Sequence, residues 1–239
     1  MRSVALVTGA GRGLGRVLAT FLAGQGHDLV ITARTDTELE EVARSLRSAG
    51  AKVAAFPGNI TDPGHRTRLL QETSALGGVS LLVNNASDLG ETPRPELAQA
   101  SLNLFRTTLE TNLVAPLALI QEALPQLERT RGLIVNITSD ASQAGYERWG
   151  IYGSSKAALD LVSKTLAIEL KPQRISVVSV DPGDMRTQMQ QEAYLNEDIS
   201  DRPLPEVTIP FWAWLIGQDP QRITGMRYQA QGTVWEVPA

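Results

Sequence analysis

The stretch VALVTGAGRGLG, residues 4–15, decides the fold, because it joins a short apolar run to a glycine-rich turn and then to a helical pattern. Residues 4–8 are almost continuously apolar, which is typical of a strand buried on both faces of a parallel sheet. Beyond the turn, apolar residues repeat with the spacing of one helix face, at Leu14, Val17, Leu18, Phe21 and Leu22. The stretch therefore predicts a strand, a tight turn and a one-sided helix in succession.

The same alternation of strands and helices continues along most of the chain. Further runs typical of buried strands occupy residues 29–32, 53–56, 79–84, 133–138 and 175–180. Strands separated by helices of this length must be joined by crossovers, which place them parallel in one sheet. We therefore expect an α/β fold with a doubly wound parallel sheet, in a single domain spanning residues 1–239.

Helix boundaries are also marked in the sequence. Thr35 and Glu38 have the spacing of a capping box, which would start a helix there, and Gly50 is suited to its end. Pro63 predicts the start of the next helix and Gly77 its end.

The alternation breaks at residues 184–210, after the sixth predicted strand. This segment is polar, contains QQE, NED and DRP, and leads into the apolar IPFWAWLI stretch. A long strandless insertion after a strand end is often an active-site lid. We expect a helical or loop-like substrate lid here, and a partly disordered loop is the alternative.

Composition excludes several classes of protein. With 22 basic and 26 acidic residues, the net charge of −4 argues against a nucleic-acid binder. Cysteine is absent and the two histidines, His27 and His65, lie far apart, so we expect no metal site. The apolar start is too short for a signal peptide and no run is long enough to span a membrane, which leads us to expect a cytoplasmic protein.

The glycine-rich turn has a chemical interpretation. Gly9, Gly13 and Gly15 fit neither the common GxGxxG dinucleotide fingerprint nor a P-loop, which would need a Gly-Lys pair. Glycines nevertheless let a backbone turn sharply and approach a pyrophosphate at a helix N-terminus. The alternative is a purely structural tight turn.

Five motifs occur in an order that resembles one family. They are Thr8-Gly9-x-x-x-Gly13-x-Gly15; Asn84-Asn85-Ala86, followed by Ser87; Asn112 with Ser139; Tyr152-x-x-x-Lys156; and Pro182-Gly183-x-x-x-Thr187. Together they resemble the motifs of the compact branch of the short-chain dehydrogenase/reductase family. This chain departs from the family pattern at Ser87, where the family has Gly. The resemblance spans almost the whole chain and implies a Rossmann-type fold with a nicotinamide cofactor.

The resemblance also implies the site residues. The expected catalytic residues are Asn112, Ser139, Tyr152 and Lys156. The expected cofactor-binding residues are Gly9, Arg12, Gly13, Leu14, Gly15, Arg34, Asn59, Ile60, Asn85, Ala86, Lys156, Pro182, Gly183 and Thr187. Asn59-Ile60 stands where the family has an Asp-Val-like pair against the adenine, which is a mild departure.

Charge favours NADP(H) over NAD(H). A carboxylate at the end of the second strand would bind the adenosine ribose of NAD and repel the extra phosphate of NADP. Ala33 and Arg34 stand there instead, and Arg12 adds a second guanidinium on the same side. Two guanidiniums and no carboxylate fit a 2′-phosphate. Alternatively, both arginines are solvated surface residues.

Tyr152 and Lys156 would share one helix face if their helix begins near Trp149. An ammonium at about 4 Å supplies about 4 kcal/mol at an effective dielectric of about 20, enough to lower the pKa of a phenol by about 3 units. By resemblance, Tyr152 is the general acid that protonates a carbonyl as hydride arrives from NADPH, and Ser139 binds the same oxygen.

Two further roles follow from the resemblance. Lys156 would also hold the nicotinamide ribose. Asn112 would distort its helix and connect Lys156 to solvent through water, and Pro116 nearby independently favours a distorted helix.

We expect an NADPH-dependent oxidoreductase acting on a ketone, an aldehyde or a secondary alcohol. A non-catalytic nucleotide-binding regulator or scaffold on the same fold is the alternative. Sugar epimerases of the longer family branch need a further substrate domain, and enoyl reductases separate Tyr and Lys more widely.

The partner is expected to be a small-molecule carbonyl or alcohol substrate. Its identity cannot be derived from the sequence, although Asp140, Tyr146 and Trp149 are expected to form part of the pocket wall. The family also implies a homotetramer or homodimer.

Overall fold

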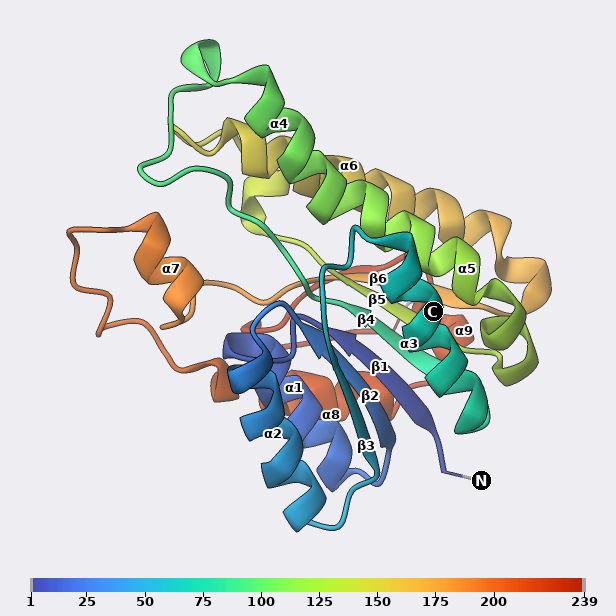
Figure 1. The fold of residues 1–239 in the computed structure, drawn as a ribbon. Coiled ribbons are helices and arrows are strands. Elements are labelled where there is room, and N and C mark those ends of the chain that lie inside the picture. Colours follow the sequence, from blue (N-terminus) through green and yellow to red (C-terminus); the bar gives the residue numbers. More distant parts are fainter. Residues whose placement is uncertain (1, 238–239) are drawn as a thin grey trace.

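Seven parallel strands form one sheet in the order β3-β2-β1-β4-β5-β6-β7 (Figure 1). This computed structural model describes residues 2–237, so residues 1, 238 and 239 of the expected domain lie outside the described residues. The strands are β1 Val4–Thr8, β2 Asp28–Ala33, β3 Val53–Pro57, β4 Val79–Asn84, β5 Leu133–Ile137, β6 Ser176–Asp181 and β7 Arg227–Gln229. The doubly wound parallel sheet is confirmed, and the six expected strands lie within one or two residues of their predicted bounds.

Helices cover both faces of the sheet (Figure 1). They are α1 Gly13–Gly24, α2 Asp36–Ser48, α3 Pro63–Ala75, α4 Leu102–Leu109, α5 Ala115–Thr130, α6 Gly150–Glu169, α7 Gln188–Ala193, α8 Ile209–Ile216 and α9 Pro220–Ile223. None of the helices within residues 2–237 is long and apolar enough to cross a bilayer.

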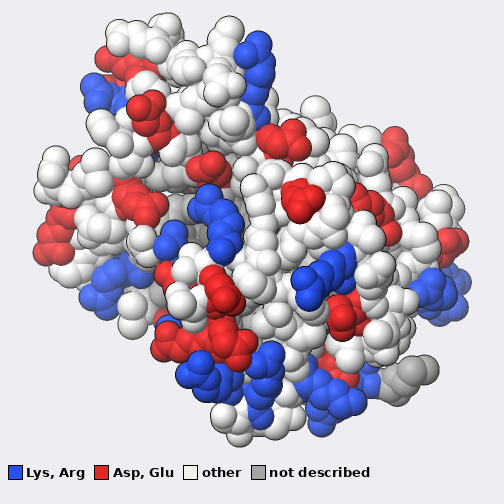
Figure 2. Space-filling view, in the orientation of Figure 1, with Lys and Arg blue, Asp and Glu red and all other residues white. Residues whose placement is uncertain are grey.

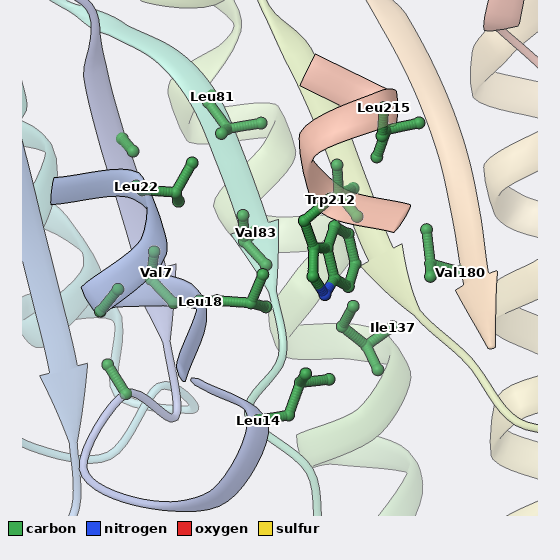
Figure 3. Close-up of a cluster of buried hydrophobic side chains, with 14 of the residues drawn as sticks. Val7, Leu14, Leu18, Leu22, Leu81, Val83, Ile137, Val180, Trp212 and Leu215 are labelled. Atoms are coloured by element: carbon green, nitrogen blue, oxygen red, sulfur yellow. The ribbon is translucent and has the colours of Figure 1, made fainter. Parts of the chain in front are cut away.

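Alternate residues of each strand point into two separate cores. In β1, Ala5 and Val7 pack on the side of α1, α2 and α8, whereas Leu6 packs on the side of α3 and α5. Figure 3 shows the first core, where Leu18 of α1 and Trp212 of α8 approach the same sheet face. Because both faces are buried, the strands are continuously apolar, and this is why the sequence pattern located them so closely.

Helix ends confirm most of the predicted boundaries. The helix α3 begins at Pro63, and Asp62 accepts a hydrogen bond from the backbone N–H of Gly64. The helix α2 follows Thr35 and ends just before Gly50, as expected. The capping box is wrong, however, because the Thr35 side chain makes no capping hydrogen bond. Glu38 instead reaches the glycine-rich loop, as described below.

Three local features go beyond the sequence prediction. The strand β7 was missed, because three residues of mixed polarity carry no strand pattern. Residues Glu110–Val114 form one π-helical turn between α4 and α5, and this turn contains Asn112. The strandless segment 184–210 contains α7 and a 3-10 turn at Pro205–Thr208, and it stands out from the body (Figure 1).

Candidate active site

A cavity of about 500 Å³ opens at the carboxyl ends of the strands, where ligands bind in open α/β sheets. It runs from the glycine-rich loop to Tyr152 and Lys156, with Met185 and Met189 of the 184–210 segment on one side. Figure 2 shows this face hollowed beside the α7 segment, with both basic and acidic side chains bordering the hollow. The segment therefore has the position expected of a substrate lid.

The glycine-rich loop is packed closely against the end of β4. Gly9 has a φ of +67°, which favours glycine, and the Asn85 amide donates to the carbonyls of both Thr8 and Gly9. A Cβ on Gly15 would lie 2.1 Å from the carbonyl oxygen of Gly9. The loop therefore has no room for a side chain at position 15, and it lines the cavity at the N-terminus of α1, which is the kind of place where backbone amides bind a pyrophosphate.

Nearly all predicted cofactor-binding residues line this cavity. They are Gly9, Arg12, Gly13, Leu14, Gly15, Arg34, Asn59, Ile60, Asn85, Ala86, Lys156, Pro182 and Thr187. Gly183 does not line it and lies next to Pro182 with a φ of +74°. The cavity extends from the glycine-rich turn to Tyr152 and Lys156, and this lining fits a nicotinamide dinucleotide.

The charges around Arg12 and Arg34 differ from the sequence prediction. No carboxylate stands at the end of β2, as predicted, but Glu38 of α2 also lines the cavity and lies 3.6 Å from the Arg12 guanidinium. Arg12 also donates to Gln188 of α7 and lies 4.0 Å from Glu192. Arg34 is exposed on the same side and forms no ion pair within residues 2–237. Arg34 is thus the cation most available to a phosphate.

Tyr152 lies in the first turn of α6, which begins at Gly150 as predicted from the sequence. The phenol is buried and close enough to the hydroxyl groups of Ser87 and Ser139 for both to lower its pKa. The Lys156 amine lies 5.4 Å from the centre of the Tyr152 ring. The structure thus brings Tyr152, Ser139 and Lys156 together, and it adds Ser87, which the sequence showed only as a departure from the family pattern.

Burial dominates the acidity of Tyr152. It raises the pKa of the phenol above its ordinary value, and the carboxylates of Asp181 and Asp140 act in the same direction. The hydroxyls of Ser87 and Ser139 oppose this shift, whereas Lys156 contributes no resolved effect. Burial therefore outweighs any lowering of this pKa by the Lys156 ammonium, and the lowering with cofactor bound stays a prediction. The phenol stays protonated, which suits a proton donor.

Lys156 is buried beneath the cavity floor. Its amine donates to the carbonyl oxygen of Ile137 at 2.9 Å. Burial lowers the pKa of Lys156 to about 8, although the Asp160 carboxylate opposes the shift. The lysine therefore changes charge near neutral pH rather than near the value of a solvated amine.

This shift predicts how stability depends on pH. The folded state binds fewer protons than the unfolded state between the folded pKa of about 8 and the ordinary value of 10.5. The free energy of unfolding should therefore rise with pH in this window, by about 2 kcal/mol between about pH 7 and about pH 10. Urea unfolding of the wild type and of Lys156→Met, compared at both pH values, measures it. Equal pH dependence in the two proteins would contradict the shift.

Asn112 lies in the π-helical turn, so the predicted helix distortion is present. Its side-chain oxygen accepts from the Asp88 amide at 2.7 Å and from the Ser87 hydroxyl at 3.2 Å. Its amide donates to the Asp88 carbonyl and to the Ser155 hydroxyl. Asn112 is therefore connected to Tyr152 through Ser87. The water connection to Lys156 stays a prediction.

The three predicted substrate residues lie beside Tyr152 rather than in the cavity lining. Asp140 accepts a hydrogen bond from the Ser139 hydroxyl at 2.9 Å. Tyr146 is 47% exposed and hydrogen-bonds Asp140, which raises the pKa of its phenol. Trp149 packs edge-on against Tyr152, with ring centres 5.6 Å apart. Of these three residues, Trp149 is therefore the one whose ring contacts the Tyr152 ring.

A buried ion network lies behind Ser139, and no sequence pattern indicated it. Arg227 of β7 lies 3.3 Å from Asp160 and 3.1 Å from Asp181. The same guanidinium donates to the Ser139 carbonyl at 2.9 Å. The network fixes the backbone of Ser139 and joins β7 to α6. It was missed because its members are far apart in sequence and β7 itself was not predicted.

Comparison with known proteins supports this arrangement. Residues 3–198 match the family model described as short chain dehydrogenase. The chain is 33% identical over 190 residues to a fatty acyl-CoA reductase of Acinetobacter baylyi, a match that covers 78% of this chain and 63% of that protein. It is 31% identical to a 3-oxoacyl-(acyl-carrier-protein) reductase of Staphylococcus epidermidis, over 87% of this chain and 85% of that protein.

A solved structure has nearly the same architecture. The crystal structure of a short chain dehydrogenase from Shigella flexneri 2a, in complex with NADP, superposes with a TM-score of 0.89. The two chains are 28% identical, and the match covers 96% of this chain and 97% of the other.

Proposed function

The chain belongs to the short-chain dehydrogenase family of nicotinamide-dependent oxidoreductases, and we propose that it uses NADPH to reduce a ketone or an aldehyde to an alcohol, or performs the reverse reaction. One observation carries this proposal. Tyr152 is buried, has a raised pKa and lines the same cavity as Lys156 and the glycine-rich loop. Tyr152 thus places a proton donor at the end of a cavity whose lining fits a dinucleotide.

The residues of this chain supply position and protons. NADPH, when bound, supplies the hydride. Ser139 and Tyr152 donate hydrogen bonds to the carbonyl oxygen, and the Tyr152 phenol transfers its proton to that oxygen. The hydroxyl groups of Ser87 and Ser139 beside the phenol favour its charged form, which eases the loss of the proton. In the reverse direction Tyr152 accepts the proton of the alcohol.

The non-catalytic alternative would be favoured by a disrupted catalytic set. All four expected residues are present here, and Ser87 links Asn112 to the phenol. The arrangement therefore supports catalysis.

A panel of ketones and aldehydes tests the proposal directly. The purified protein is incubated with NADPH and each carbonyl compound, and cofactor oxidation is compared with alcohol formation. Equal amounts of oxidised cofactor and alcohol are the expected result. An absence of turnover in both directions across the panel, by a protein that binds the cofactor, would contradict the function.

Arg34 is proposed to select NADPH over NADH. Arg34→Ala should weaken NADPH binding about 10-fold or more and leave NADH binding nearly unchanged, because a guanidinium contact to a phosphate is lost. Isothermal titration with both cofactors measures this, and Arg44→Ala provides a control at a second exposed arginine, which lies in α2. Equal losses for both cofactors would contradict the phosphate contact.

Glu38→Gln tests the preference for NADPH over NADH with a variant that should strengthen it. Removing the carboxylate beside Arg12 should tighten NADPH more than NADH, since that carboxylate competes with the phosphate for the Arg12 guanidinium.

We also propose assembly into a homodimer or homotetramer. Leu161 and Ile168 of α6 are 66% and 76% exposed, and apolar side chains on one helix support such an interface. A cytoplasmic location remains a prediction from the sequence alone.

A further inference from the structure

The guanidinium groups of Arg94 and Arg202 both lie close to the ring of Tyr194. Arg94 also stacks on Trp149, which contacts Tyr152. The Arg94 guanidinium stacks 3.7 Å from the centre of the Trp149 ring and lies 5.4 Å from the Tyr194 ring. The Arg202 guanidinium lies 4.2 Å from the same Tyr194 ring. Tyr194 directly follows α7, so this cluster joins the lid segment to the loop before α4.

The guanidinium groups of this cluster keep unused donors. Nε and Nη1 of Arg94 and Nη1 of Arg202 are buried, and none has a hydrogen-bond partner within residues 2–237. No carboxylate of that range lies within ion-pair distance of Arg94, and the nearest to Arg202 is Asp184 at 3.9 Å. Glu197 affects Arg94 only through longer-range attraction. Buried donors without acceptors are unfavourable unless a ligand supplies the acceptors.

Another arginine of this chain shows what a purely structural stack looks like. Arg68 lies 4.7 Å over the Phe56 ring, but its side chain is exposed and its donors face solvent. The Arg94 stack differs because two of its donors are removed from water. Stacking on Trp149 therefore does not by itself account for the position of Arg94.

The cluster lies one aromatic ring away from the reacting phenol. Trp149 contacts Arg94 on its face and Tyr152 by its edge. Trp149, Met189 and Ala193 pack against the small buried cluster that contains Tyr152, so α7 covers this side of the site. Arg94 and Arg202 lie outside the residues that line the cavity, so a substrate that meets Tyr152 reaches them only by extending past Trp149.

From this geometry we infer that the substrate carries an anionic group, a carboxylate or a phosphate, which Arg94 and Arg202 bind. This inference rests on the proposed function, because it concerns the far end of the molecule whose carbonyl meets Tyr152. Guanidinium groups bind such oxyanions through paired hydrogen bonds and are readily desolvated. Arg94 is the principal contact, and Arg202 adds a second positive charge from the segment that follows α7.

Matched pairs of oxo acids and their methyl esters test the inference. We compare values of kcat/KM with NADPH for two series of probes. The first contains oxo acids of graded length, from 4-oxopentanoate to 7-oxooctanoate, and the second contains the corresponding phosphate monoesters of hydroxyketones. The wild type should prefer at least one acid or phosphate over its neutral counterpart by about 10-fold or more, as for a charge-assisted contact. The carboxylate and phosphate series together show which oxyanion is bound.

Variants of Arg94 show whether the preference for acids over esters depends on the arginine cluster. Arg94→Met should remove the preference while leaving turnover of the neutral esters within about 3-fold, and Arg94→Lys should keep part of it. Arg68→Met is the matched control, since it removes an arginine–aromatic stack away from the site. A preference that survives in Arg94→Met, or equal turnover of acids and esters by the wild type, would overturn the inference.

A binding measurement separates this inference from the proposed function. If no carbonyl compound is reduced, the proposed function fails, and titration of the NADP⁺-loaded protein with the same acids and esters still decides the anion site. Binding of an acid, but not its ester, to the wild type and not to Arg94→Met supports the site. Equal binding of both by the two proteins rules it out.

Discussion

Tyr152→Phe is expected to lower kcat/KM for carbonyl reduction by about 1,000-fold, while NADPH binds with nearly unchanged affinity. The variant removes only the phenolic oxygen, so the ring still packs against Trp149 and fills the buried position. Without that oxygen, no proton donor remains in contact with Ser87 and Ser139 at the end of the cavity. Steady-state kinetics and cofactor titration together measure the effect.

Tyr146→Phe is the control for this substitution. Tyr146 is 47% exposed and hydrogen-bonds Asp140 rather than lining the cavity. Its replacement should change kcat/KM by less than about 10-fold, because no proton-transfer group is lost. Turnover by Tyr152→Phe similar to that of the wild type would refute the role of Tyr152 as proton donor.

Gly15→Ala is expected to weaken the binding of both nicotinamide cofactors by about 100-fold or more, which corresponds to the loss of about 3 kcal/mol. The added methyl would lie 2.1 Å from the Gly9 carbonyl oxygen and 2.6 Å from the Asn85 amide nitrogen. Backbone cannot move aside as a flexible side chain can, so the glycine-rich loop must shift. Its amides would then no longer meet the pyrophosphate.

Gly24→Ala in the same helix provides the comparison. Nothing lies within 4 Å of a Cβ at this position, so the substitution adds no contact and should leave cofactor binding unchanged. Thermal unfolding of both variants shows whether Gly15→Ala remains folded. A folded Gly15→Ala that binds NADPH as tightly as the wild type would contradict the placement of the pyrophosphate at this loop.

The fold could be predicted because its strands are buried on both faces. The runs at Val4–Thr8 and Val79–Asn84 have no polar alternation, and the observed strands match them. The strand β7 lies at the edge of the sheet and contains Arg227, Tyr228 and Gln229. Its identity depends on pairing with β6, which no local pattern encodes.

The candidate site could be predicted only as a set of residue types in order. The resemblance supplied Tyr152, Lys156 and Ser139; Tyr152 and Lys156 line the cavity, and Ser139 lies beside Tyr152. The contacts that surround them come from other elements. Glu38 reaches the cavity from the first turn of α2, and the capping-box interpretation assigned it a different role.

Electrostatics were the weakest part of the sequence prediction. The spacing of Tyr152 and Lys156 indicated an ammonium near a phenol, and the two side chains do lie close together. Spacing carries no information on burial, however, and burial raises the pKa of the phenol and lowers the pKa of the amine. The sign of a pKa shift in this site is therefore set by the fold and not by the motif.

The central claim is that the cavity binds a nicotinamide dinucleotide with its reactive end at Tyr152. Isothermal titration of the purified protein with NADPH and with NADH tests it most directly. The account predicts saturable binding of one NADPH per chain at a dissociation constant in the micromolar range, weaker binding of NADH, and the loss of both in Gly15→Ala. A folded protein that binds neither cofactor at millimolar concentration would contradict the account.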